Sequence, residues 1–221
     1  RKNIINLLRS LKKKLHNKAL LVSGLETLGI KNQDNLTYKL LIYMKLLIKW
    51  NQTYNLTAIT EEPHIITHHL LDCLSVIKLI NAKNILDVGS GAGLPGLILA
   101  FCFPDKKITM VEKVGKKTAF IQQIIGEFSL NNARVLNDRV EDVKNYREYD
   151  GIISRAFSDM ETLINLTSHL LVEEGNWYAM KSRKSRANEM AAIKYPYHMD
   201  KINVPHLNAE RYLITVVNAV N

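Results

Sequence analysis

The stretch that decides the fold runs from Asn84 to Gly96 and reads N-I-L-D-V-G-S-G-A-G-L-P-G. Its first part, Ile85–Val88, has the apolar character of a short buried strand. Four glycines follow within eight residues, and the apolar run that starts at Leu97 predicts a helix. A strand, a glycine turn and a helix form the opening unit of a nucleotide-binding α/β domain. Glycines in such a turn let backbone N–H groups approach a ligand closely.

Alternating strand and helix patterns continue from this unit to the C-terminus. The predicted strands cover residues 85–88, 107–112, 133–137, 150–154, 176–181, 197–204 and 211–217. Helices are predicted at 94–103, 115–128 and 159–172, with Gly175 as the break before the fifth strand, and a basic helix is predicted after residue 181. Repeated β-α-β units predict an α/β fold with a mostly parallel seven-stranded sheet and helices on both faces. The closing hairpin around Pro205 predicts one antiparallel strand.

The apolar spacing of the first 80 residues predicts helices and no strands. Residues 1–20 contain seven basic side chains and no acidic one, with leucine and isoleucine at helical spacing. Such a helix could lie on RNA, on a membrane surface, or on the protein body with a solvated face. Further helices are predicted at 36–51 and 65–80, joined by a polar and aromatic loop. We therefore expect a helical extension over 1–80 and an α/β domain over 81–221.

Composition supports this division and narrows the class of protein. A chain of 221 residues with 47% hydrophobic residues has room for one α/β domain and a small extension. The net charge of +9 favours a polyanionic partner such as nucleic acid, although lysine-rich composition can also follow from genome bias. No run is long enough for a membrane span, and the basic N-terminus does not resemble a signal peptide. Cys73 and Cys102 form no disulfide framework, so reduced thiols and a cytoplasmic location are expected.

Three histidines near the third predicted helix raise the question of a metal site. His64 and His68 are four residues apart, as are His69 and Cys73. No glutamate completes the H-E-x-x-H pattern and no second ligand pair is apparent, so no metal site is expected.

The glycine turn also matches G-x-G-x-x-G over residues 91–96, which is typical of dinucleotide-binding folds. Three features favour another ligand. Asp87 precedes Gly89 and gives D-x-G-x-G-x-G, Pro95 removes a backbone donor where a pyrophosphate would need one, and an acidic residue follows the third strand.

Acidic residues stand at three predicted strand ends: Asp87, Glu112, and Glu141 or Asp142. In an open parallel sheet these ends line one crevice. S-adenosylmethionine suits such a crevice. Its ribose diol can bind a carboxylate such as Glu112, its adenine amino group needs an acceptor near the third strand, and its methionine part can lie against the glycine turn.

Together these residues resemble the GidB (RsmG) family of small-subunit ribosomal RNA methyltransferases, which methylate a guanine at N7. The resemblance covers roughly residues 36–217. It rests on Trp50-Asn51, Tyr54 to Ala58, His69 with Asp72, Leu86 to Gly96, Glu112, Gly115 to Lys117, Arg139 to Glu141, Ile153 to Ala156, and Met180-Lys181. Glu112 stands where the family often has Asp, and Ser182 where it often has Gly.

The resemblance implies a Rossmann-like, class I S-adenosylmethionine-dependent methyltransferase fold. It also implies that Gly89, Leu94, Val140, Glu141 and Arg155 contact the cofactor. The residue pattern adds four further cofactor-binding candidates, which are Asp87, Gly91, Gly93 and Glu112.

The implied substrate is small-subunit ribosomal RNA or a ribosomal particle. Arg155, Arg139 and Lys181 are expected to position it, and Asn51, Asn55 and His69 to line a helical lid. Phosphate contacts are expected from Lys116, Lys117, Arg183, Lys184 and Arg186, for which a solvated face is an equal alternative. For Arg155 the alternative is a salt bridge to Asp87 or Glu112.

Guanine N7 carries a free lone pair, so the expected mechanism aligns the reactants and needs no general base. We expect a monomer without stable membrane association. Two other functions stay open at this point: an NAD-dependent oxidoreductase, and a non-catalytic basic protein that binds RNA or a membrane surface.

Overall fold

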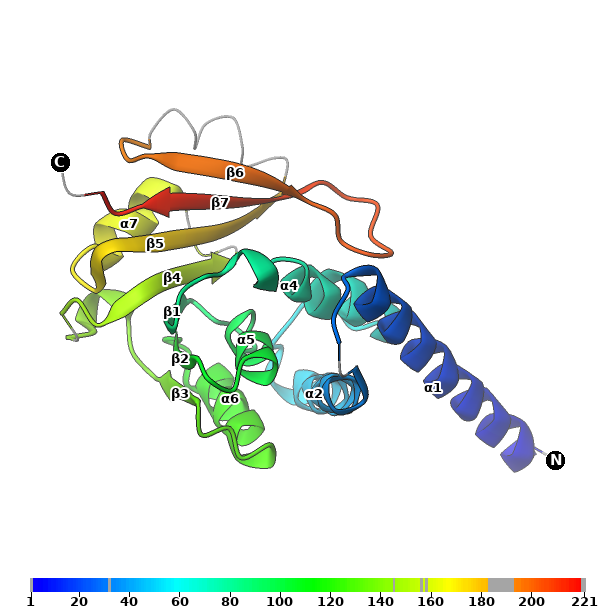
Figure 1. Cartoon of the computed structure of the whole chain (residues 1–221). Helices are drawn as coiled ribbons and strands as arrows, with labels where there is room; N and C mark the ends of the chain where they lie inside the picture. Colours follow the sequence, from blue (N-terminus) through cyan, green and yellow to red (C-terminus); the bar gives the residue numbers. More distant parts are fainter. Residues whose placement is uncertain are drawn as a thin grey trace.

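The computed structural model describes residues 2–31, 33–144, 146–155, 157, 159–182 and 193–219. One seven-stranded sheet forms the centre of the molecule, with the strand order β3-β2-β1-β4-β5-β7-β6 (Figure 1). Strands β1 to β5 are parallel, and β7 runs antiparallel to both of its neighbours. This confirms the predicted mostly parallel sheet with one antiparallel strand. The strands are β1 (Asn84–Val88), β2 (Lys107–Val111), β3 (Ala133–Leu136), β4 (Tyr149–Arg155), β5 (Leu171–Ser182), β6 (Tyr197–Ile202) and β7 (Arg211–Val217).

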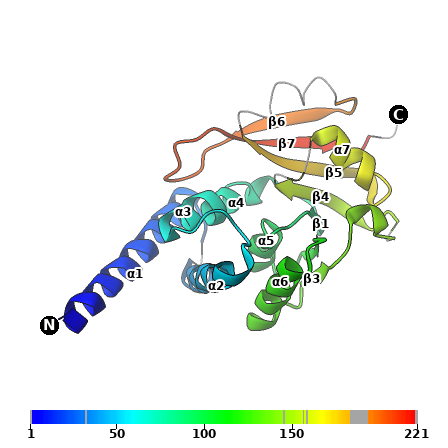
Figure 2. The same ribbon diagram turned by 180° about the vertical axis from the view of Figure 1, so that it is seen from behind.

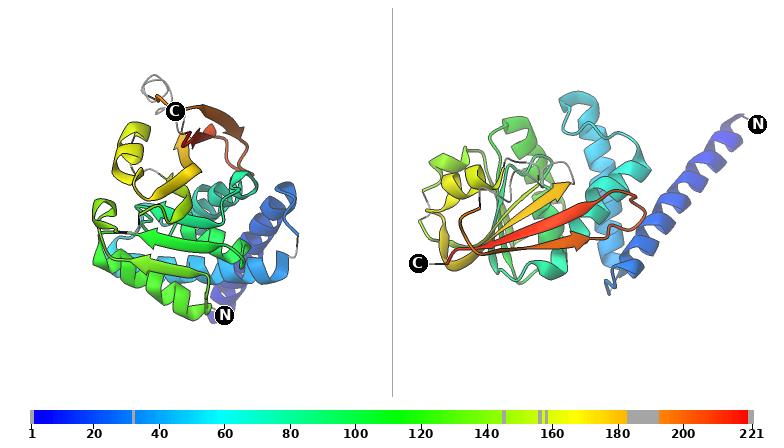
Figure 3. Two further views of the ribbon diagram at one scale, coloured as in Figure 1. Left: turned by 60° about the vertical axis from the view of Figure 1, so that its left-hand side comes forward. Right: turned by 90° about the horizontal axis from the view of Figure 1, so that it is seen from above.

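Helices cover both faces of this sheet, and the first of them extends away from the body of the molecule (Figures 1, 2 and 3). Helices α2, α5 and α6 pack together on one face, while α7 packs on β5 on the other. The helical elements are α1 (Lys2–Thr27), α2 (Gln33–Tyr54), α3 (Glu62–Ile65), the π-helix η1 (Ile66–Leu71), α4 (Asp72–Leu74), η2 (Ile77–Leu79), α5 (Gly96–Cys102), α6 (Gly115–Glu127), η3 (Val140–Asp142) and α7 (Met160–Thr167).

The two faces of the sheet form two hydrophobic cores, because successive side chains of a strand point to opposite sides. Ile85 and Ile153 pack with the helices on the first face. Leu86, Ile152 and Trp177 pack with α7 on the second face. The apolar runs of the central strands are therefore buried on both sides, as expected for parallel strands covered by helices.

The N-terminal helices share the first core with the sheet. Leu25 of α1 and Leu40 and Tyr43 of α2 are fully buried in the same cluster as Ile98 of α5 and Ile121 of α6. The division of the chain at residue 80 therefore stays a prediction, because apolar packing continues across it.

The fifth strand corrects one prediction. We expected a helix to Val172, a break at Gly175 and a strand from residue 176, but α7 ends at Thr167 and β5 already starts at Leu171. Leu171 pairs with Tyr149 across a register shift, and Gly175 lies inside the strand. An apolar run such as Leu170–Val172 fits a helix or a strand equally well, and pairing with β4 decides for the strand.

The third helix is also more irregular than predicted. A single helix was expected over 65–80, but the segment starts at Glu62, passes through the π-helix η1 and ends at Leu74. A π-helical stretch redirects backbone carbonyl groups, and here the carbonyl of His68 accepts a hydrogen bond from Arg155 Nη1 at 3.1 Å. The irregularity therefore connects the helical part to the sheet.

Some predicted features lie outside the described residues, among them the basic helix with Arg183, Lys184 and Arg186. Cys73 and Cys102 are both free thiols. None of the described helices combines the length and apolar character that a membrane span needs.

Gly151 provides a test of the sheet packing. A Cβ atom added there would lie 2.4 Å from Ala82 Cβ and 3.3 Å from Tyr178 Cε2. We expect Gly151→Ala to lower the free energy of unfolding by about 1–3 kcal/mol through overpacking. Urea denaturation measures this change. In the matched control, Gly126→Ala in α6, the added Cβ meets no atom within 4 Å, so stability should hold or rise slightly. Equal stability of the two variants would contradict the packing described.

Candidate active site at the carboxyl edge of the sheet

The candidate site is a cavity of about 340 Å³ at the carboxyl ends of β1, β2 and β3. In an open α/β sheet, ligands bind outside these strand ends, next to the point where the strand order reverses. Here that point lies between β1 and β4. The residues that line the cavity are Val88, Gly89, Val111, Glu112, Lys113, Val114, Lys117, Asp138, Arg139, Val140, Glu141, Phe157 and Leu166.

Glu112 follows β2 and holds the glycine turn from inside the cavity. Its Oε2 accepts a hydrogen bond from the backbone N–H of Gly91 at 2.9 Å, and its Oε1 accepts one from Val114 N–H at 2.9 Å. The residue is 6% exposed. Each carboxylate oxygen can accept a second hydrogen bond, so Glu112 can hold the turn and bind a ligand hydroxyl together.

Asp87 has different surroundings from those predicted. It lies near the end of β1, as expected, but it is fully buried, and its Oδ2 accepts a hydrogen bond from Gly96 N–H at 2.8 Å. Side chains alternate along a strand, so Asp87 shares the side of Ile85 and faces α5. Asp87 therefore anchors the first turn of α5, and the expectation that it lines the crevice is wrong.

The start of α5 argues against a dinucleotide site. The N–H of Gly96 points inward to Asp87, and Leu97 N–H donates to the carbonyl of Gly93 at 2.8 Å. Pro95 has no N–H to offer. The helix start therefore lacks the outward-facing donors that a pyrophosphate requires.

A third contact reaches the glycine turn from the N-terminal helices. Tyr43 of α2 donates its hydroxyl to the carbonyl of Ala92 at 2.8 Å, and the contact is buried. Its ring packs against Phe120 of α6 with 5.8 Å between ring centroids. The helical part of the chain thus helps to fix the turn.

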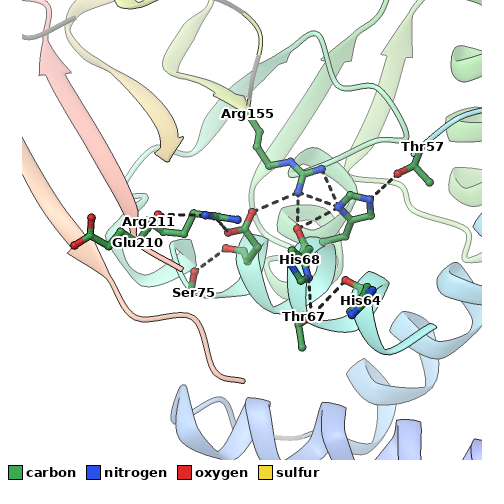
Figure 4. Close-up of polar contacts among 10 residues, drawn as sticks. Thr57, His64, Thr67, His68, Ser75, Arg155, Glu210 and Arg211 are labelled. Carbon is green, nitrogen blue, oxygen red and sulfur yellow. Dashed lines mark hydrogen bonds and ion pairs between the residues drawn. The ribbon is translucent and has the colours of Figure 1, made fainter. Parts of the chain in front are cut away.

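Arg155 ends β4 and belongs to a polar network that joins three parts of the chain (Figure 4). Its Nη1 lies 3.4 Å from Asp72 Oδ2, and Arg211 Nε lies 3.0 Å from Asp72 Oδ1. The side chain of Asp72 is only 7% exposed. Burial raises the pKa of the Asp72 carboxyl, and the two guanidinium groups oppose this rise. The salt-bridge partner of Arg155 is therefore Asp72, not Asp87 or Glu112 as considered from the sequence.

His69 completes this network as a neutral side chain. Its Nδ1 lies 3.3 Å from both Nη atoms of Arg155, and its Nε2 lies 2.9 Å from Thr57 Oγ1. Nδ1 also lies 3.2 Å from the carbonyl oxygen of His68. Burial and the charge of Arg155 lower the pKa of His69 to about 4. This imidazole is therefore neutral at physiological pH and has both nitrogens engaged.

The remaining predicted residues fall into two groups. Gly89, Glu112, Arg139, Val140 and Glu141 meet in the cavity, and Lys117 joins them. The side chain of Arg139 is 61% exposed and lies 3.6 Å from Glu141.

The other candidates lie elsewhere. Lys116 is exposed at the start of α6, and Lys181 is buried within β5. Leu94 is buried behind the turn, where its N–H and that of Gly93 both donate to Ser90 O. Asn51 and Asn55 line a second cavity on α2.

Sequence reasoning missed several residues that the fold brings in. Phe157 and Leu166 form the apolar side of the cavity, Arg211 reaches Asp72 from β7, and Tyr43 reaches the glycine turn. Phe157 alone had a usable signal, since it follows the end of a predicted strand.

The lining suits a nucleoside that carries a charged tail. Glu112, Asp138 and Glu141 offer carboxylate acceptors, while Val140, Phe157 and Leu166 offer apolar surface. Gly89 has φ +68°, and a Cβ there would meet Phe157 Cδ2 at 2.7 Å, so only glycine lets the ring lie against the strand end. These residues fit S-adenosylmethionine. In the described part of the chain, no group of three or more His, Cys, Asp or Glu side chains could hold a metal ion.

Solved structures of other proteins have the same fold as this chain. A predicted O-methyltransferase from Agrobacterium tumefaciens superposes with a TM-score of 0.56 at 20% identity, covering 66% of this chain and 80% of that one. A SAM-dependent methyltransferase from Aquifex aeolicus gives a TM-score of 0.56 at 15% identity, covering 71% and 94%. The fold is that of the class I S-adenosylmethionine-dependent methyltransferases.

Sequence comparison identifies the family. The profile described as rRNA small subunit methyltransferase G (GidB) matches residues 36–214. Ribosomal RNA small subunit methyltransferase G of Methylobacillus flagellatus is 41% identical over 194 residues, which are 88% of this chain and 95% of that protein. The protein of the same name from Coxiella burnetii is 40% identical over 202 residues, or 90% and 97%.

The chain belongs to the rRNA small subunit methyltransferase G (GidB) family. It is therefore an S-adenosylmethionine-dependent ribosomal RNA methyltransferase, as the resemblance implied.

Asp87 makes the stability of the protein depend on pH. Burial raises the pKa of Asp87 from 3.8 to about 7, although the hydrogen bond from Gly96 N–H opposes this rise. The native protein thus binds this proton more tightly than the unfolded chain does. Its contribution to stability is complete below pH 3.8 and is lost as the pH rises to about 7.

We expect Asp87→Asn to flatten this part of the stability curve. Urea denaturation of the cofactor-free protein at several pH values measures the slope. Asp105→Asn, which removes an exposed carboxylate, is the control for net charge. A wild-type slope in Asp87→Asn would show that Asp87 does not carry the effect.

Proposed function

We propose that this protein transfers the methyl group of S-adenosylmethionine to N7 of a guanine in small-subunit (16S) ribosomal RNA. The observation that carries the proposal is the cavity at the carboxyl edge of the sheet. Glu112 and Gly89 line it together with Val140 and Glu141, which follow β3. Its residues match the needs of the cofactor, and Gly89, Glu112 and Arg139 to Glu141 among them come from the segments that resemble the family.

Within this cavity, Glu112 would accept hydrogen bonds from the ribose hydroxyls, and Glu141 with Val140 would hold the adenine. Gly89 and Gly91 would let the methionine part approach the backbone. The cofactor supplies an electrophilic methyl group on a sulfonium. Arg155 stays a candidate for substrate positioning, since the network around Asp72 fixes its guanidinium at the end of β4.

The mechanism requires alignment and the exclusion of water rather than proton transfer, since neutral guanine has a lone pair at N7. His69 supports this proposal, because both of its ring nitrogens already contact protein groups. Guanine N7 lies in the deep major groove of A-form RNA, so the target base must be unpaired or exposed. Arg139 and Lys117 at the cavity rim, with Lys116 nearby, would contact phosphates.

We also propose that the protein acts as a monomer. A ribosomal substrate also implies that the protein acts in the cytoplasm.

The position and chemistry of methylation test the proposal directly. Purified protein is incubated with labelled S-adenosylmethionine and ribosomal RNA or small subunits, and N7-methylguanine is mapped by reduction and strand cleavage. We expect one guanine to be modified, with a rate that stays level from neutral to mildly alkaline pH. Placing 7-deazaguanine at that site should abolish transfer. Methylation elsewhere on the base would refute N7 as the nucleophile, and a steep pH dependence would indicate a general base.

Gly91 tests the placement of the cofactor. It has φ +58°, and its N–H donates to Glu112. In Gly91→Asp a second carboxylate would stand beside Glu112, and the two negative charges would repel each other. We expect calorimetry to show at least about a tenfold loss of cofactor affinity as a result. Gly91→Asn has the same size and tolerates the same φ without the charge, so it should lose less. Unchanged affinity of Gly91→Asp would place the cofactor elsewhere.

A further inference from the structure

A second cavity, of about 600 Å³, lies between the C-terminal half of α2 and the chain that leads to η1. It shares no lining residue with the cavity at the carboxyl edge. Leu47 and Ile65, both fully buried, form its floor. Asn51, Gln52, Asn55 and Thr57 contribute polar groups around it.

Hydrogen bonds fix the wall of this cavity. The side chain of Asn51 donates to the carbonyl of Thr57 at 3.0 Å and accepts from Thr57 N–H at 2.8 Å. Thr57 Oγ1 accepts from Ile59 N–H at 3.1 Å. Asn55 has φ +49°, a conformation that Asn adopts more readily than most residues. The loop is therefore held in one shape by its own side chains.

The chemistry of the lining points to a neutral, planar ligand. None of the ten lining residues is charged, so the cavity offers no cationic side chain to a phosphate. Gln52 and Asn55 are exposed, and their amides make no hydrogen bond to other described residues. A free amide presents a donor beside an acceptor, which matches the edge of a nucleobase, while the aliphatic floor suits its faces.

The cavity also lies close to the reacting edge of the sheet. Thr57 contacts His69, and His69 contacts Arg155 at the end of β4 (Figure 4). A base held against Thr57 would therefore be separated from β4 by two side chains. Sequence-specific recognition of RNA commonly uses bases that are turned out of the helix.

We propose that this second cavity binds an unstacked nucleobase of the RNA substrate through Gln52 and Asn55. The proposal rests on the proposed function, because it requires RNA as the substrate. The second cavity contributes affinity for the RNA and sets the position of the RNA on the protein, while the cavity with Glu112 holds the cofactor.

The test uses the double variant Gln52→Ala, Asn55→Gly, which removes both amides and keeps the backbone conformation at residue 55 accessible. We expect KM for the RNA or small subunit to rise about tenfold, the size of one lost bidentate base contact. The cofactor Kd should stay unchanged. The dependence of RNA affinity on salt should keep its slope, because no phosphate contact is removed.

Thr53→Ala is the matched control, since Thr53 is exposed on the same turn of α2 and does not line the cavity. A second variant, Ala58→Leu, fills part of the cavity without removing a side-chain hydrogen bond, and it should also raise KM for RNA. If the double variant fails to fold, Ala58→Leu alone tests whether the cavity binds a base.

Unchanged KM for RNA in both variants, with normal methylation by the wild type, would overturn this inference alone. A shallower salt dependence in the double variant would mean a phosphate contact and would overturn it as well. Absence of methylation by the wild-type protein would instead refute the proposed function.

Discussion

Two carboxylates hold the glycine turn on opposite sides, and the site depends on this arrangement. Asp87 accepts from Gly96 and Glu112 accepts from Gly91, so side chains at the carboxyl ends of β1 and β2 fix both ends of the segment between these glycines. Tyr43 adds a third contact from α2. A turn fixed before the ligand arrives need not be ordered on binding, which favours affinity and alignment.

The network around Asp72 performs a comparable task for the helical part of the chain. Asp72 bridges Arg155 of β4 and Arg211 of β7, and the partners are 83 and 139 residues away in sequence. A buried charge that loses one partner is costly, so the cluster favours one position of α4 against the sheet. The network also fixes the guanidinium of Arg155 beside His69. Two arginines paired with one carboxylate leave a net positive charge at this edge of the sheet. This charge suits a polyanionic substrate.

Much of the fold was predictable because it follows from local patterns. The alternation of strands and helices, the single antiparallel strand and the helix that starts at Gly115 agree with apolar periodicity and with the rules for β-α-β units. The start of β5 was not predictable, since Leu170–Val172 has no period of its own and pairing with Tyr149 decides its conformation. The π-helical stretch before Asp72 was missed for a similar reason, because its partner Arg155 comes from a distant strand.

The sequence by itself determined the order of elements, the glycine turn and the family, since these depend on contiguous motifs and local spacing. Only the tertiary structure decided which acidic residues face a ligand. Asp87 and Glu112 both belong to apolar strands that lead into turns, and the sequence treats them alike. Alternation along β1 turns Asp87 toward α5, whereas Glu112 lies just beyond the end of β2 and lines the cavity.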